Sequence, residues 1–238
     1  MAAKSPTSSS PSSPSTSKFF DKNAGNVYSA ILSLISFGIG TNALFTLLSY
    51  VLPPQLATAG HFQFLTNLSL LLSIIFWFFN IVNHIVKNNY LEQFKLITLW
   101  VATTLETIVF LVYWPLRLLA PGLIIAGEYI PLWVDLSIHF VPFFSLTVEY
   151  YCFSKPCTLS FSTLSTICYT LTTVYWVWLH SKMDETSSFP YPFLAVKTDV
   201  RVIIFFVIGS TALSCILLNK LIYSKIWKNE IESKLKSY

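Results

Sequence analysis

The stretch "FQFLTNLSLLLSIIFWFFN", residues 62–80, decides the fold class of this chain. It carries no charged side chain, and a helix of about 20 apolar residues is long enough to cross the hydrocarbon core of a bilayer. The apolar run is continuous rather than alternating, which favours a helix over a strand of a membrane barrel. Polar side chains nevertheless stand near its start, at Thr66, Asn67 and Ser69, and their presence there needs an explanation.

The composition of the whole chain agrees with a membrane protein. Hydrophobic residues make up 54% of the 238 residues, only 11% are charged, and the mean hydropathy is +0.61, whereas soluble domains are roughly 25% charged. The net charge of +4 comes without a basic cluster interleaved with aromatic residues on a soluble face. Nucleic acid is therefore excluded as a partner.

Six apolar segments are long enough to be spans. The fold class is accordingly all-α, a polytopic membrane protein. The fourth segment differs from the others because it contains two prolines and the ionisable residues Asp135, His139 and Glu149. The predicted spans lie near residues 27–51, 62–86, 94–118, 130–151, 159–179 and 202–223.

Three regions follow along the chain. Residues 1–24 begin with a Ser/Pro-rich stretch that has almost nothing apolar to bury, so this tail is expected to be disordered. Residues 25–223 form the six-helix transmembrane domain. Residues 224–238 form a basic tail.

The distribution of basic residues predicts the orientation. Three lysines precede the first span, two lie between the second and third, one lies between the fourth and fifth, and five lie at or beyond the end of the sixth. These eleven compare with four Lys or Arg residues in the remaining loops, so the positive-inside rule predicts that both termini are cytosolic.

The C-terminal sequence "ESKLKSY" contains Lys234 and Lys236. This pair resembles the dilysine signal that coat machinery reads on cytosolic tails of endoplasmic-reticulum proteins, and it predicts that location and that partner. The alternative is that both are ordinary solvated lysines after a last helix.

Ionisable groups inside a bilayer are costly, so each is a functional candidate. With the predicted topology, Thr66 lies about 7 Å and His139 about 12 Å below the lumenal face. His180 ends on the same side, whereas His84 and Glu149 fall at the cytosolic ends and are set aside. Thr66 and His139 are thus a hydroxyl and an imidazole at matched depth on different helices.

A hydroxyl and an imidazole form the minimal pair of nucleophile and base. Asp135 stands four residues before His139, so its carboxylate either holds the imidazole tautomer or is an interfacial carboxylate at a helix start. A threonine in a membrane helix is more often an interhelical hydrogen bonder. From the residues alone both interpretations stay open.

Five motifs in order change that balance: "FQFLTNLSLLLSIIF", "IPLWVDLSIHFVPFF", "YWVWLH", "YPFL" and "VRVIIFFVIGST". Together they resemble the androgen-induced-protein family, the relatives of the androgen-dependent TFPI-regulating protein. The resemblance implies a multi-pass threonine hydrolase that cleaves fatty acid esters of hydroxy fatty acids in the membrane. It also implies that Thr66 is the nucleophile and His139 the base, although the family typically has Asn-His where Asp135 and Leu136 stand.

Three further residues are candidate supporting groups. Asn67 is adjacent to Thr66 but about 100° around the helix, which leaves it as an oxyanion donor candidate only. His180 resembles a family histidine and is a candidate at the lumenal mouth. Glu106 either lines the cavity or bonds to a neighbouring helix, and the second role is favoured.

The expected function is therefore a membrane ester hydrolase whose substrate is a bilayer lipid. The mechanism needs no metal or organic cofactor, and the four cysteines are expected to be structural. Two alternatives remain. A transporter or channel would use Glu106, Asp135 and His139 as a polar relay, and a non-enzymatic scaffold would use its tails to bind partners.

Overall fold

The computed structural model describes residues 26–123, 130–184 and 186–236. These residues are almost entirely helical, and none of them is in a strand. The predicted all-α class is therefore confirmed. The long helices are α2 (Val27–Ser49), α4 (Leu65–Val86), α5 (Asn89–Leu119), α8 (Phe161–Lys182) and α9 (Thr198–Lys236).

The fourth predicted span is a broken helix. It consists of α6 (Leu132–His139), α7 (Val141–Val148) and a π-helical turn, η3 (Glu149–Phe153). Pro142 follows the break, and it has no N–H to offer the carbonyl of Ile138, so the regular hydrogen-bond ladder cannot continue. His139 is thereby the last residue of a short helix.

Short elements connect these helices outside the long segments. Between α2 and α4, Gln63 donates to the carbonyls of Leu56 (2.6 Å) and Gly60 (2.9 Å), which folds this connection tightly. Helix α4 begins at Leu65, three residues later than the predicted span, because a 3₁₀ turn precedes it. The short elements are α3 (Pro54–Ala57), η1 (His61–Gln63), η2 (Pro121–Leu123) and η4 (Pro192–Leu194).

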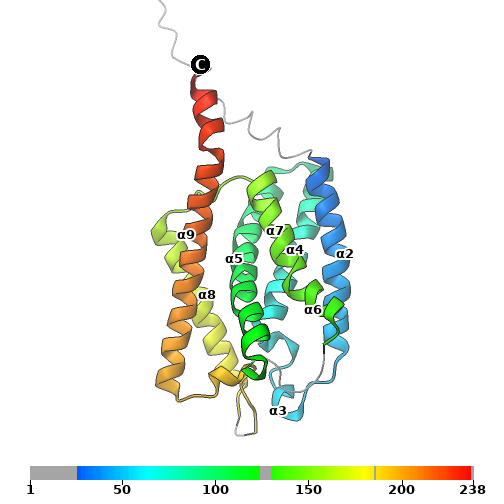
Figure 1. Cartoon of the computed structure of the whole chain (residues 1–238), viewed down its shortest axis with the longest axis vertical. Coiled ribbons are helices and arrows are strands. Elements are labelled where there is room, and N and C mark those ends of the chain that lie inside the picture. Colours follow the sequence, from blue (N-terminus) through cyan, green and yellow to red (C-terminus); the bar gives the residue numbers. More distant parts are fainter. Residues whose placement is uncertain (1–25, 124–129, 185, 237–238) are drawn as a thin grey trace, which may run out of the picture.

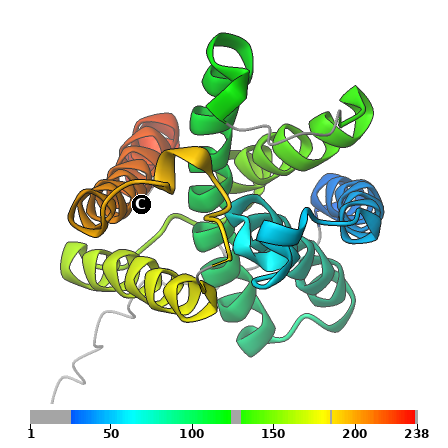
Figure 2. The ribbon, with the colours of Figure 1, turned by 90° about the horizontal axis from the view of Figure 1, so that it is seen from below.

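The helices form two groups (Figure 1). Helices α2, α4, α5 and the α6–α7 segment pack together, with α5 near the middle of the molecule. Helices α8 and α9 form a hairpin beside α5, as the view along the helices in Figure 2 shows. The fold thus brings α4, α5, α8 and α9 around a common space.

The packing of α2 against α4 rests on small residues. Ser29, Ser33, Ser36, Gly40 and Ala43 recur at spacings of three or four residues and are all buried, as expected where membrane helices approach closely. The closest approach is at Gly40, where a Cβ atom would lie 2.6 Å from the indole of Trp77.

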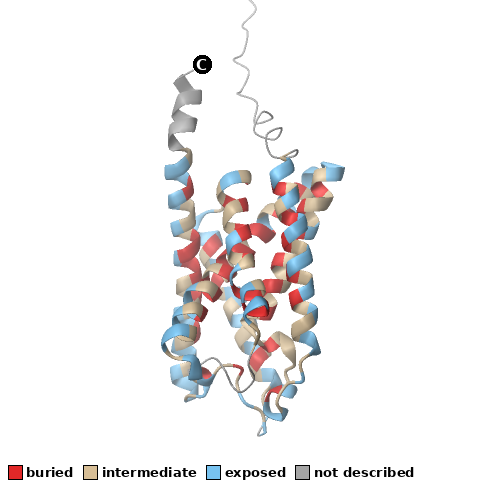
Figure 3. Ribbon diagram, turned by 45° about the vertical axis from the view of Figure 1, so that its right-hand side comes forward, coloured by how far each residue is buried: buried red, intermediate tan, exposed pale blue. Residues whose placement is uncertain are grey.

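The buried residues face the interior of the bundle (Figure 3), and many of the exposed residues are large and apolar. Large side chains such as Leu34, Phe45, Val174 and Phe206 are 59–68% exposed, which a bilayer accommodates and water does not. Within the described part, five helical segments are long and apolar enough to cross a membrane, and the broken fourth segment is one of them. Helix α8 has the length, but its many Ser and Thr residues make it less apolar.

The predicted N-terminal tail, residues 1–24, lies outside the described residues. The predicted C-terminal tail begins within α9, which continues unbroken to Lys236. The cytosolic placement of both termini stays a prediction, as does the dilysine signal at Lys234 and Lys236.

Candidate active site

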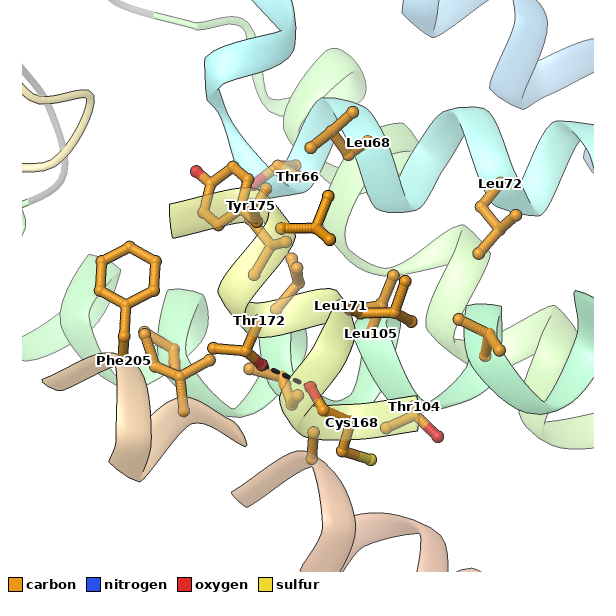
Figure 4. A pocket seen from close by; sticks show the side chains of 18 of the residues that line it. Thr66, Leu68, Leu72, Thr104, Leu105, Cys168, Leu171, Thr172, Tyr175 and Phe205 are labelled. Carbon is orange, nitrogen blue, oxygen red and sulfur yellow. Dashed lines mark hydrogen bonds between the residues drawn. The ribbon is translucent and has the colours of Figure 1, made fainter. Parts of the chain in front are cut away.

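A cavity of about 990 Å³ lies between the two helix groups. Side chains of α4, α5, α8 and α9 line it together with the connection between α8 and α9, and nearly all of them are apolar. Figure 4 shows Thr66 and Tyr175 at one end of this lining, and Cys168 and Thr104 toward the other. The shape and chemistry of this space suit an acyl chain.

Thr66 lies in the first turn of α4, where it is half-buried and lines the cavity. The N-terminus of α4 has no side-chain cap of its own, since Phe64 occupies that position. Instead, the backbone N–H of Leu65 donates to the hydroxyl of Tyr191 at 2.9 Å. A distant residue thus satisfies one of the N–H groups that a helix start leaves open.

Asp135 and His139 lie together on α6, as their spacing predicts. The imidazole Nδ1 is 3.0 Å from Asp135 Oδ1 and 3.2 Å from the backbone carbonyl of Asp135. Both neighbours are acceptors when the carboxylate is ionised, so the proton of a neutral imidazole belongs on Nδ1. The lone pair is then on Nε2, the form that a general base requires.

Two residues of α5 complete the environment of Asp135. The hydroxyl of Tyr113 donates to Oδ1, and Arg117 Nε donates to Oδ2 at 3.4 Å. Asp135 is 1% exposed, and a buried carboxylate is tolerated only when such donors surround it. Tyr113, Arg117, Asp135 and His139 are called the Asp135 cluster below.

Tyr113 connects this cluster with the cavity. Its ring stacks on the imidazole of His139, with the ring centroids 3.4 Å apart and the planes 5° from parallel. The same side chain lines the cavity that Thr66 lines, whereas His139 is not one of the lining residues. Tyr113 therefore connects the imidazole with the cavity wall.

The other candidate residues hold the structure together. Asn67 is buried, and its amide donates to the carbonyl of His61 at 2.7 Å. Glu106 is fully buried, and Ser73 of α4 donates to it at 3.1 Å, so Glu106 links α5 to α4. Neither Asn67 nor Glu106 lines the cavity.

His180 lies at the end of α8 and pairs with Arg201 of α9, at 3.1 Å between Arg201 Nη1 and His180 Nε2. Because arginine only donates, Nε2 must be the acceptor, and Nδ1 then donates to the carbonyl of Trp176 at 3.0 Å. The lone pair of His180 is occupied, so this imidazole supports the α8–α9 connection.

A second buried polar cluster lies at the opposite end of the bundle. Ser29 of α2 donates to Glu149, with distances of 2.9 and 2.8 Å to its two carboxylate oxygens. His84 Nε2 lies 3.2 Å from the Ser29 hydroxyl. None of these residues lines the cavity. Ser29, Ser33, Asn80, His84, Glu149 and Ser154 are called the Glu149 cluster below.

A metal site needs several His, Cys, Asp or Glu side chains close together. The four cysteines at 152, 157, 168 and 215 are unpaired, and only Cys152 is exposed. In the part of the chain that the structure describes, no group of three His, Cys, Asp or Glu side chains is arranged to hold a metal ion.

Sequence reasoning missed Tyr113, Arg117 and Tyr191. The first two stand four residues apart on α5, the same spacing as Asp135 and His139 on α6, and this parallel pattern was a usable signal. Tyr191 is the first residue of the "YPFL" motif, which carried the family resemblance but did not indicate a contact with Thr66, 125 positions earlier. Only the tertiary fold brings Tyr191 to the start of α4.

Comparison with known proteins gives relatives of the same kind. The UPF0641 membrane protein YHR140W of Saccharomyces cerevisiae is 35% identical over 182 residues, which cover 68% of this chain and 76% of that protein. The UPF0641 membrane protein PJ4664.05 of Schizosaccharomyces pombe is 28% identical over 168 residues, or 69% and 75% of the two chains. No solved structure matches significantly.

The model of the FAR-17a/AIG1-like protein family matches residues 28–224, which include every long helix from α2 to the middle of α9. The match agrees with the family resemblance of the sequence motifs and with the helical membrane fold. This chain belongs to the FAR-17a/AIG1-like family.

Proposed function

We propose that this protein is an ester hydrolase of the endoplasmic-reticulum membrane that cleaves fatty acid esters of hydroxy fatty acids or similar acyl esters. Thr66 is the nucleophile, and His139 is the general base. One observation carries the proposal: a single apolar cavity has Thr66 in its wall and, through Tyr113, contacts the buried Asp135–His139 pair.

In the proposed reaction, Thr66 Oγ1 attacks the ester carbonyl carbon while its proton passes to His139 Nε2. The carbon–oxygen bond to the alcohol then breaks, and the alcohol leaves with that proton. Water, with the same imidazole as base, attacks the acyl group on Thr66 and releases the fatty acid. Asp135 holds the Nδ1 proton and stabilises the imidazolium that forms.

The position of Tyr113 adds one requirement. Because Tyr113 stacks on the imidazole and His139 itself does not line the cavity, the proposed proton transfer to Nε2 requires the side chains at this wall to rearrange. The reaction therefore includes a rotation of Tyr113 when the ester enters. The base is kept away from the apolar chain until then.

The cavity supports a lipid substrate in particular. Its volume of about 990 Å³ is at the upper end of the roughly 300–1,000 Å³ found for small-molecule sites. Its walls offer an acyl chain apolar contacts along most of its length. A soluble, polar ester would gain little from such walls.

The test compares Thr66→Ala, His139→Ala and wild-type protein in membranes. Two readouts are labelling by a fluorophosphonate probe and hydrolysis of a fatty acid ester of a hydroxy fatty acid. Both are expected to be lost in Thr66→Ala, and hydrolysis in His139→Ala, with expression unchanged. Thr98→Ala is the matched control, since Thr98 also lines the cavity but donates to the Phe94 carbonyl at 2.8 Å.

Equal labelling and hydrolysis in all four proteins would overturn the assignment. A transporter would instead lose its transport on replacement of Glu106 and tolerate Thr66→Ala. A scaffold would still bind its partners after Thr66→Ala and after replacement of Glu106. The comparison therefore separates the three classes of function.

A further inference from the structure

Tyr191 lies outside the spans, in the connection between α8 and α9, yet its hydroxyl reaches the start of α4. It accepts the N–H of Leu65 at 2.9 Å. Thr66 is close enough to influence the ionisation of this phenol, and both residues line the cavity. The hydroxyl group of Tyr191 is therefore an immediate neighbour of the candidate nucleophile.

Aromatic contacts hold the Tyr191 ring in place. Phe64, the residue before α4, meets it edge to face with ring centroids 5.9 Å apart. Phe193 stacks on it at 5.3 Å with planes 9° from parallel. The ring is thus held by the α2–α4 connection and by its own segment.

Arg201 in turn fixes the segment that carries Tyr191. Its Nε donates to the carbonyl of Leu194 at 2.8 Å, and its Nη2 donates to that of Val196. Its guanidinium lies 3.7 Å from the ring centre of Phe189, and Nη1 pairs with His180. The connection is thereby attached to both α8 and α9, which keeps the phenol near Thr66.

The hydrogen-bond inventory of Tyr191 leaves its own proton available. The Leu65 N–H uses one lone pair of the phenol oxygen, so the O–H can still be donated, either to the Thr66 hydroxyl or to an oxygen of the substrate. Burial raises the pKa of Tyr191 above its ordinary value, so the phenol keeps this proton at neutral pH. The positive end of the α4 dipole lies at the same place.

We propose that the Tyr191 hydroxyl is the oxyanion donor of this site. The inference rests on the proposed function, because it needs Thr66 as the nucleophile. As Thr66 Oγ1 bonds to the carbonyl carbon and its proton moves to His139, the carbonyl oxygen becomes negatively charged. The Tyr191 O–H donates to that oxygen until the carbon–oxygen bond to the alcohol breaks and the carbonyl re-forms.

Tyr175 provides a matched control. It lines the same cavity and lies near Thr66 (Figure 4), but its hydroxyl donates to the backbone carbonyl of Gln63. The Tyr175 proton is therefore already used in a hydrogen bond. Removing either hydroxyl changes one oxygen atom in the same region, and only Tyr191 is expected to affect the chemical step.

The experiment compares Tyr191→Phe, Tyr175→Phe and the wild-type protein in detergent or membranes. Loss of an oxyanion donor lowers kcat by about 10²–10³-fold, and KM is expected to stay near the wild-type value. Tyr175→Phe keeps the ring that lines the cavity and is expected to lower kcat far less than Tyr191→Phe does. A second readout is inhibition by a trifluoromethyl ketone with the same acyl chain, whose adduct with Thr66 carries an oxyanion.

The inhibitor readout separates chemistry from structure. Tyr191→Phe is expected to weaken binding of the trifluoromethyl ketone as strongly as it lowers kcat, and to leave binding of the corresponding ether, which forms no adduct, unchanged. A variant that was merely misfolded would lose both ligands. Unchanged kcat and ketone affinity in Tyr191→Phe would overturn the inference.

The two proposals fail in different ways. If Thr66→Ala abolishes hydrolysis and Tyr191→Phe does not lower kcat, the proposed function stands and only the role of Tyr191 is wrong. If Thr66→Ala hydrolyses the ester at the wild-type rate, the proposed function itself is wrong.

Discussion

Asp135 and Glu149 are two buried carboxylates in the same broken helical segment, and they have different surroundings. Each is 1% exposed, so burial does not distinguish them. The Asp135 carboxylate is bound by the side chains of Tyr113, Arg117 and His139. Of these, Tyr113 also lines the cavity. Glu149 accepts hydrogen bonds from Ser29 and Ser154 and does not line the cavity that Thr66 lines.

The difference teaches how to separate a candidate site from a structural network. A buried charge needs donors in either case, because an unpaired one is costly. What the Asp135 cluster adds is an imidazole that stacks on Tyr113, a residue that lines the cavity. The following predictions test that distinction, from the largest expected effect on hydrolysis to the smallest.

The largest contrast is expected between the two histidines. His139→Ala removes the base, and general base catalysis contributes about 10²–10⁴-fold, so ester hydrolysis is expected to fall by that factor. His84→Ala, in the Glu149 cluster, is expected to hydrolyse the ester at the wild-type rate. Rates are measured on purified protein in lipid nanodiscs. Equal losses in both variants would contradict the distinction.

Replacing the two carboxylates by amides is expected to have different effects on kcat and on stability. Asp135→Asn lowers kcat by about 10²-fold or more, since the imidazole loses the group that fixes its tautomer. Glu149→Gln keeps kcat but weakens a buried charge-assisted network, at a cost of about 1–3 kcal/mol in the free energy of unfolding. Steady-state kinetics and thermal unfolding of both variants measure this crossover. A Glu149→Gln protein with reduced kcat and normal stability would refute it.

A smaller effect is expected from the connection that carries Tyr191. Arg201→Ala releases the carbonyls of Leu194 and Val196, and a misplacement of about 1 Å costs up to about 10²-fold, so kcat is expected to drop about tenfold. Hydrogen exchange in residues 186–197 is expected to accelerate in parallel. The control is Lys197→Ala, at an exposed position of the same connection. Faster exchange without a change in kcat would show that the position of this connection does not affect the reaction.

The smallest effect on hydrolysis is expected at the α2–α4 contact, away from the cavity. Gly40→Ala places a methyl group 2.6 Å from Trp77, and such overpacking costs about 1–3 kcal/mol. Gly38→Ala meets nothing within 4 Å and is expected to be stabilising by up to about 1 kcal/mol. Thermal unfolding midpoints distinguish the two variants, and kcat is expected to be unchanged in both.

The sequence was sufficient for the helices and for one half of the candidate site. Long apolar runs predicted the membrane helices, and the spacing of Asp135 and His139 predicted their contact, because both features are local. The break after His139 was missed, although Pro142 signals it. Helix α8 was predicted as a span with the others, but its Ser and Thr content leaves it less apolar than the five candidates.

The other half of the candidate site depends on contacts between distant segments. Whether Glu106 lines the cavity or bonds to α4 is decided by the rotation of α5, which the sequence does not give. Tyr191 reaches the start of α4 through the fold of the α8–α9 connection, to which Arg201 donates hydrogen bonds. The sequence pattern also could not show that Tyr113 covers the imidazole.

The π-helical turn has a practical consequence through Cys152. Of the four cysteines, this one alone has an exposed side chain, at the end of the bundle opposite Thr66. Cys152 lies one residue before the end of the fourth candidate span, so a membrane-impermeant maleimide tests whether this thiol meets water. Sealed microsomes would report, without any engineered tag, which compartment that end of the molecule faces.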